Sequence, residues 1–226
     1  MIEDMQLVHL EDVIDIHIAA FPDSFLTQLG RPALKILYKD FSSTGFAYVY
    51  REDNKVLGVL AGTTTSVETF YQELIKKHLL RFALVIPIAV IQRPTTFTPI
   101  LLRLRRLFQK PKFDSYIAEP EYDLVLNSKG KVAHALTIGV SPQSRGKGIA
   151  KQLWNHLLHD LPQRGVEAIL GSVRSDNDIT NGFYEKMGFK KIVQMQRNHF
   201  TAEYRWLFYW KDHCVVTESG KVEWNN

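Results

Sequence analysis

The chain is 226 residues long, carries a formal net charge of +4, and is 45% hydrophobic. This composition suits one fairly large domain with a sizeable core and excludes a globally disordered chain. The single cysteine, Cys214, excludes an internal disulfide framework and a cysteine cluster for a metal, so we expect no metal. Residues 1–6 contain acidic side chains and no apolar core, unlike a secretory signal. We therefore expect an intracellular, cytoplasmic protein.

Apolar residues at helical spacing predict the first helices. Residues 7–20 carry such a pattern, and it ends before Pro22. Asp23-Ser24 provides a cap for a second helical stretch that reaches Phe41. Gly30 and Pro32 are expected to interrupt that stretch, because glycine and proline disfavour a helix interior.

Strand patterns follow in several places along the chain. Residues 46–50 and 55–61 flank a turn-rich link, which predicts a β-hairpin. Residues 122–126 and 131–140 flank Asn127-Ser-Lys-Gly130, which predicts a second hairpin. Further on, we expect a buried strand at 166–173, a helix at about 179–187 with Gly188 as its C-cap, and a final strand pair at 190–195 and 200–210. Cys214 lies late in an aromatic strand pattern and is expected to be a structural thiol.

Residues 66–113 are unusual. They hold apolar helical patterns at about 70–80 and 100–108, with an apolar run at 82–91 between them. Nine Lys or Arg residues and no acidic residue lie between Leu74 and Phe113. The apolar run is shorter than the roughly 20 residues that cross a bilayer. We favour a helical insertion that covers part of the core and has a solvated basic face. Contact with a membrane surface through residues 74–113, or with an anionic substrate, is the alternative.

Residues 136–150 run from a strand through a glycine-bearing turn into a helix. Gly146 and Gly148 allow backbone NH groups to turn towards a common point, and the start of a helix presents unpaired NH donors that suit a phosphate. Arg145 and Lys147 add positive charge at the same place. The pattern therefore predicts a phosphate-binding turn. An ordinary strand-to-helix turn with solvated basic side chains is the alternative, because short glycine patterns occur widely.

Two separate motifs point to one family. The first is Gln143-Ser-Arg-Gly-Lys-Gly-Ile-Ala150, preceded by Val140-Ser-Pro142. The second covers residues 177–189, Asn-Asp-Ile-Thr-Asn-Gly-Phe-Tyr-Glu-Lys-Met-Gly-Phe. In this order, and separated by a helix and a strand, they resemble the motifs of the GNAT superfamily of acyl-CoA-dependent N-acyltransferases. The resemblance covers residues 131–195 well and 1–65 in outline, and it does not cover the insertion.

The resemblance implies a fold and an acyl donor. The fold is α/β (α+β), with a mixed, mostly antiparallel central sheet flanked by helices. Here it would form a single domain over residues 1–226 with an insertion at about 66–113. The donor is acetyl-CoA: backbone amides of the glycine turn would hold its pyrophosphate, and the preceding strand end would pair with its pantetheine arm. Asn177 resembles the residue that hydrogen-bonds the pantetheine or the following loop. The implied donor-binding residues are Ile138, Gly139, Val140, Gln143, Ser144, Arg145, Gly146, Lys147, Gly148, Ile149, Ala150, Asn177 and Tyr184.

The resemblance also implies catalytic residues. Tyr184 resembles the residue near the CoA sulfur that protonates or stabilises the departing thiolate, with an aromatic core contact as the alternative. His134 falls where several family members place a base, although a half-buried, satisfied histidine fits the strand equally. Glu119, Glu121 and Asp123 are the other candidates for the base.

The implied activity is N-acetylation of a primary amine of a small molecule or peptide, by direct attack on acetyl-CoA in a ternary complex. Members that acetylate protein N-termini often carry Glu where this chain has Ser172, which weakens that particular acceptor without excluding it. An acyl-CoA-binding sensor without turnover is one alternative. A nucleic-acid or membrane-surface protein that acts through the basic insertion is another, but the sequence lacks the aromatic–basic interleaving of a nucleic-acid module. We therefore expect no specific nucleic-acid partner.

Overall fold

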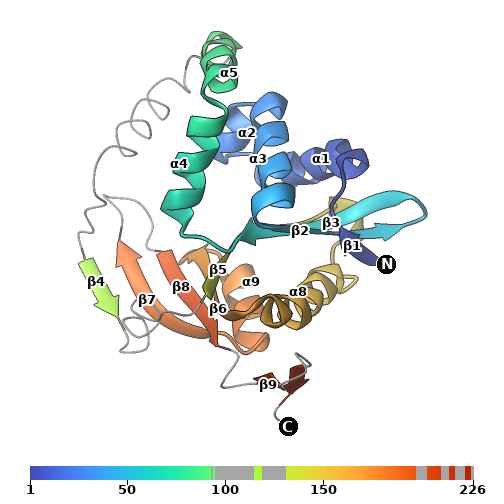
Figure 1. Ribbon diagram of the computed structural model, residues 1–226, viewed down its shortest axis with the longest axis vertical. Coiled ribbons are helices and arrows are strands. Elements are labelled where there is room, and N and C mark those ends of the chain that lie inside the picture. Colours follow the sequence, from blue (N-terminus) through green and yellow to red (C-terminus); the bar gives the residue numbers. More distant parts are fainter. Residues whose placement is uncertain are drawn as a thin grey trace. The chain divides into compact units, whose positions relative to one another are not determined.

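A computed structural model describes residues 1–92, 94, 115–118, 131–196, 203–209, 214–216 and 222–224 (Figure 1). The chain divides into two compact units. Unit 1 comprises Met1–Pro111 and Thr137–Leu153, and unit 2 comprises Lys112–Leu136 and Trp154–Asn226. Strand β5 (Lys131–Val140) and helix α8 (Ile149–Asp160) each contribute residues to both units. Each unit is described by itself.

The strands of unit 1 are β1 (Ile2–Asp4), β2 (Phe46–Glu52), β3 (Lys55–Thr63) and the C-terminal part of β5. Strand β2 pairs antiparallel with both β1 and β3, and the end of β5 lies beside β3. Asp53 and Asn54 form the β2–β3 turn with φ values of 46° and 62°. Such positive angles match the right-handed twist of a hairpin, and the first predicted hairpin is confirmed.

Short helices and caps of unit 1 follow the sequence closely. Its helical elements are η1 (Leu7–His9), α1 (Leu10–Ala20), α2 (Phe25–Gln28), α3 (Arg31–Thr44), α4 (Val67–Lys77), α5 (Leu79–Gln92), η3 (Pro142–Ser144) and the start of α8. The Oγ of Ser24 accepts a hydrogen bond of 3.1 Å from Thr27 N and caps α2. Gly30, with φ of 87°, separates α2 from α3 as predicted, whereas Pro32 does not interrupt the helix and lies in the first turn of α3, where proline is tolerated. Helices α1 and α3 pack against the hairpin of β2 and β3 (Figure 1).

The unusual segment begins with two helices, α4 and α5. Phe70 and Leu74 of α4 are buried, as are Phe82 and Ala89 of α5, and the ring of Phe70 stacks on Phe41 of α3 at 4.9 Å. These helices therefore cover part of the core of unit 1. The predicted helix at 100–108 lies outside the described residues, and the insertion boundaries stay a prediction.

Unit 2 holds most of the remaining strands. The N-terminal part of β5 pairs parallel with β6 (Val166–Arg174), and β6 pairs antiparallel with β8 (Glu203–Tyr209). The order continues through β7 (Lys190–Gln196) to β4 (Ser115–Ala118), with antiparallel pairs throughout. The helical elements are the rest of α8, η4 (Leu161–Arg164) and α9 (Asp178–Lys186), and β9 (Cys214–Val216) pairs with β10 (Val222–Trp224) separately.

The predicted fold class is confirmed: the sheet is mixed, mostly antiparallel and flanked by helices. The predicted pair at 190–195 and 200–210 is β7 with β8, and Gly188, with φ of 81°, follows α9 as its C-cap. The predicted strand at 122–126 lies outside the described residues. Within the described ranges, no helix is both long enough and apolar enough to cross a bilayer.

Candidate active site

The glycine turn of unit 1 has the backbone shape that the sequence predicts. Strand β5 ends at Val140, and Ser141 N donates a hydrogen bond of 2.9 Å to Leu57 O of β3. Gly146 and Gly148 then adopt φ values of 78° and 75°. An ideal Cβ at either position would meet nothing within 4 Å. The left-handed backbone, rather than a shortage of space, is what favours glycine here.

The turn leads directly into helix α8. Helix α8 begins at Ile149, and the NH groups of its first turn have no acceptor within the helix. Arg145 and Lys147 are exposed beside these amides, and Arg145 Nε donates a bond of 3.4 Å to Val140 O. Gln143 accepts from Ser141 Oγ at 2.8 Å, so its side-chain oxygen turns back onto the loop. Positive charge and helix-end amides thus occur together, the arrangement that binds phosphate.

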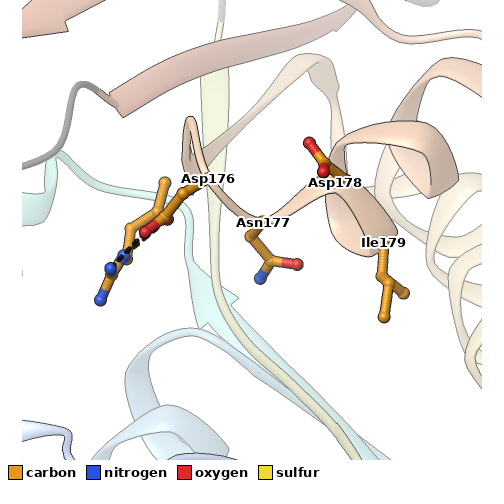
Figure 2. Close-up of a pocket in the computed structure, with 5 residues that line it drawn as sticks. Asp176, Asn177, Asp178 and Ile179 are labelled. Carbon is orange, nitrogen blue, oxygen red and sulfur yellow. Dashed lines mark hydrogen bonds and ion pairs between the residues drawn. The ribbon is translucent and has the colours of Figure 1, made fainter.

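In unit 2, Asn177 lies between β6 and α9, where a pocket of ≈ 490 Å³ is lined by Arg174, Asp176, Asn177, Asp178 and Ile179. Its Oδ1 accepts a 3.1 Å bond from Thr180 N and caps α9. Figure 2 shows Asn177 and Ile179 projecting to one side of the turn and Asp178 to the other. Asn177 is exposed, and its Nδ2 has no hydrogen-bond partner among the described residues.

Tyr184 of α9 is buried in an aromatic cluster. Only 4% of the residue is exposed, and its ring makes edge contacts with Trp154 and Phe189 at centroid distances of 5.4 and 4.8 Å. Its ring edge and hydroxyl lie over the backbone of Gly171 in β6, where an ideal Cβ would come within 2.5 Å of Tyr184 Oη. Burial raises the pKa of the Tyr184 phenol. The hydroxyl therefore stays protonated at neutral pH and is able to act as a donor.

A comparison with protein families finds a match over one part of the chain. Residues 106–189 match the model of the family described as "Acetyltransferase (GNAT) family". The match contains both the glycine turn and the Asn177–Tyr184 motif. Over these residues the chain is therefore similar to the GNAT acetyltransferases.

The GNAT fold is also found among solved structures. The ribosomal-protein-S18-alanine N-acetyltransferase of Escherichia coli is similar over 92% of both chains, with 14% identity and a TM-score of 0.54. Ard1 of Thermoplasma volcanium gives 14% identity and a TM-score of 0.55 over 92% of this chain and 96% of its own. Arabidopsis thaliana NAA60, solved in complex with acetyl-CoA, gives 13% and 0.54 over 92% and 98%. At these identities the likeness shows the shared fold.

Of the four candidates for the base, one lies within the described residues. His134 is half-buried on β5, paired in register with Leu170 of β6 in unit 2. Glu119, Glu121 and Asp123 lie outside the described residues. Ser172 is exposed on β6. The identity of the base therefore stays a prediction.

Sequence reasoning missed two close-packing glycines. An ideal Cβ at Gly58 of β3 would lie 2.7 Å from Ile149 Cγ2 and 3.1 Å from Leu153 Cδ1, so this glycine lets the start of α8 approach β3. Gly171 does the same for Tyr184 in unit 2. Neither glycine lies in a turn pattern. The available signal was a glycine in the interior of a predicted strand, because such a glycine often marks a place where another group packs closely on the backbone.

Sequence reasoning also missed three buried, hydrogen-bonded side chains near the end of β5 in unit 1. Tyr38 of α3 is fully buried and hydrogen-bonds Thr137 of β5, and its hydroxyl lies 2.8 Å from His17 Nδ1 of α1. Burial lowers the pKa of His17 to about 4, so its ring is neutral at physiological pH. Beside these side chains, Gly139 lets Ile16 approach, with an ideal Cβ 3.1 Å from Ile16 Cγ2. These contacts fix the position of the strand end that is predicted from the sequence to pair with the donor.

Asn181 is a further residue without an earlier assignment. Its Nδ2 donates to Arg174 O at 3.0 Å and to Ser175 O at 3.4 Å. The first turn of α9 is thereby tied to the end of β6, which fixes the loop that carries Asn177. Its place inside the second motif was the available signal.

Proposed function

We propose that this chain is an acetyl-CoA-dependent N-acetyltransferase that acts on a primary amine of a small molecule or peptide. One observation carries the proposal: the left-handed turn at Gly146 and Gly148, which opens α8 beside Arg145 and Lys147. This is a cradle for a diphosphate. The acetyl-CoA complex of the A. thaliana relative supports the choice of donor.

Donor binding is assigned residue by residue. Backbone amides of residues 143–150 hold the pyrophosphate, and the polar groups of the strand end at 138–140 pair with the pantetheine arm. Asn177 uses Oδ1 as a helix cap and donates from Nδ2 to the pantetheine. Arg145 and Lys147 contribute long-range attraction to the anion, since their side chains are exposed and solvent-screened.

The reaction is a direct transfer. The amine loses a proton to a base, its nitrogen forms a bond to the thioester carbonyl carbon, and the C–S bond then breaks to release CoA thiolate. Tyr184 stabilises that thiolate by a hydrogen bond or gives it a proton. Because burial raises the pKa of the phenol and makes it a weaker acid, the hydrogen bond is the favoured role. His134 is the first candidate for the base, with Glu119, Glu121 and Asp123 as alternatives. Proximity and orientation of the two substrates supply a large share of the rate.

The test is release of free CoA from acetyl-CoA over a panel of amino sugars, amino acids, polyamines and peptides. With an accepted amine, Tyr184→Phe should lower kcat by about 10²-fold or more while changing the KM for acetyl-CoA little. Tyr50→Phe, a half-buried tyrosine of β2, is the matched control and should retain activity. Unchanged turnover in Tyr184→Phe would remove the proposed role of that hydroxyl.

One observation favours a second function. The burial of Tyr184 against Gly171 is also what a structural aromatic residue requires. In that case the chain would be a sensor that binds acyl-CoA without turnover. Calorimetric binding of acetyl-CoA, combined with no CoA release over the whole amine panel, would favour the sensor. CoA release with any amine would exclude it.

A further inference from the structure

Helix α5 is more apolar than a helix with one solvent-facing side usually is. Its 14 residues, Leu79–Gln92, include a single charged side chain, Arg81. Five large apolar residues of α5 are strongly exposed: Leu79 at 61%, Leu80 at 82%, Leu84 at 70%, Ile88 at 55% and Ile91 at 79%. The spacing of four, four and three residues from Leu80 to Ile91 places the last four along one face of the helix. A contiguous apolar face of this kind marks an interaction surface.

The opposite face of α5 is already used. Phe82 and Ala89 are 7% and 4% exposed and belong to the core of unit 1. The helix is therefore held to its unit by one side and presents a second apolar side outwards. Covering the core, which the sequence also predicts for this segment, does not account for that second side.

The charge around α5 selects the kind of partner. Lys76 and Arg81 are exposed at the junction of α4 and α5, and Lys77 between them is also exposed but forms an ion pair of 2.8 Å with Asp40 of α3. In the sequence, nine Lys or Arg residues and no acidic residue lie between Leu74 and Phe113. A second copy of the chain would bring two such basic segments together, and like charges would oppose the contact. An anionic surface is attracted by the same charges.

We propose that the exposed face of α5 docks on an anionic lipid surface. Leu80, Leu84, Ile88 and Ile91 would enter the interface between headgroups and acyl chains, and Lys76 and Arg81 would contact lipid phosphates and carboxylates. Helix α5 is too short to cross a bilayer, so it lies in the plane of the surface. This inference concerns where the protein resides and is independent of the proposed acetyl transfer.

The test uses the full chain in sedimentation with phosphatidylcholine vesicles, with and without phosphatidylserine. We expect binding that requires phosphatidylserine and weakens as salt is raised. The pair Leu84→Gln and Ile88→Gln should weaken partitioning on the order of tenfold or more, because the buried apolar area is lost. The matched control is Leu7→Gln with Val8→Gln, since these residues are also exposed, at 68% and 80%, but lie outside α5. Arg81→Gln should reduce the dependence on phosphatidylserine.

Four results would overturn the proposal. One is the absence of vesicle binding at low salt, and another is equal loss in the α5 pair and the control pair. The third is a lowered melting temperature in the α5 pair, which would show that the chain itself covers this face. The fourth is a concentration-dependent dimer that the α5 pair abolishes, which would assign the face to a second copy instead. Failure here leaves CoA release without vesicles unchanged, so it is distinguishable from failure of the proposed function.

Discussion

The glycines of the turn and the glycines of the strands serve opposite purposes. At Gly146 and Gly148 there is room for a side chain, but φ values of 78° and 75° disfavour one. At Gly58 and Gly171 the reverse holds: an added Cβ would come within 2.7 and 2.5 Å of a neighbouring side chain. The turn therefore depends on backbone conformation, and the strands depend on close packing.

This difference determines what a substitution does. In the turn, a new side chain would change the orientation of the backbone amides without displacing any buried residue. In the strands, it would displace a residue that belongs to the proposed chemistry, either Ile149 at the start of α8 or Tyr184 of α9. Alanine at each of the four positions therefore separates conformational cost from steric cost.

The largest effect is expected for Gly171→Ala. The new Cβ would lie 2.5 Å from both Cε1 and Oη of Tyr184, and the ring cannot move freely because Trp154 and Phe189 pack against it. Overpacking of this kind costs about 1–3 kcal/mol. Urea unfolding should show that loss, and CoA release should fall further than unfolding explains. Wild-type stability and turnover in this variant would contradict the placement of Tyr184 over β6.

Gly58→Ala should have an intermediate effect. Here the nearest atom, Ile149 Cγ2, is the end of a side chain that can shift, so we expect about 1–2 kcal/mol and weaker acetyl-CoA binding as α8 is displaced. Ile149→Leu removes the Cβ branch that carries Cγ2 at nearly constant volume. The double variant should recover at least about 0.5 kcal/mol relative to the sum of the single changes. Strict additivity in a double-mutant cycle would rule out this contact as the cause.

Gly146→Ala should cost less and act on binding. A left-handed alanine costs about 1 kcal/mol, and the altered amides should raise the KM for acetyl-CoA several-fold with a smaller change in kcat. Gly146→Asn is the control, because asparagine tolerates positive φ better than alanine. Asparagine should therefore retain more of the affinity. If both variants bind acetyl-CoA like the wild type, the amides of the turn do not hold the pyrophosphate.

The sequence predicts the turn well and the packed layers poorly, for a physical reason. The φ of Gly146 and the cap by Asn177 depend on a few neighbouring residues, so local patterns contain them. The fit of Gly58 to Ile149 joins residues 91 positions apart, and no local pattern contains that contact. The same holds for the chain from Thr137 through Tyr38 to His17, whose members come from three elements. The outward apolar face of α5 was visible only as an apolar run, because its direction depends on packing against α3.

The smallest effect, of opposite sign, is expected at Gly182. This glycine lies inside α9, two residues before Tyr184, and an ideal Cβ there would meet nothing within 4 Å. It therefore lacks the steric constraint of Gly171, and its φ does not lie in the left-handed region that constrains Gly146. Gly182→Ala should stabilise the protein by about 0.5–1 kcal/mol, since alanine is the better helix former. Thermal unfolding would show this gain, with CoA release unchanged. A loss of activity at unchanged or higher stability would instead mean that a substrate approaches α9 at Gly182. Room for a substrate would then be a third reason for glycine in this protein, beside left-handed backbone in the turn and close packing in the strands.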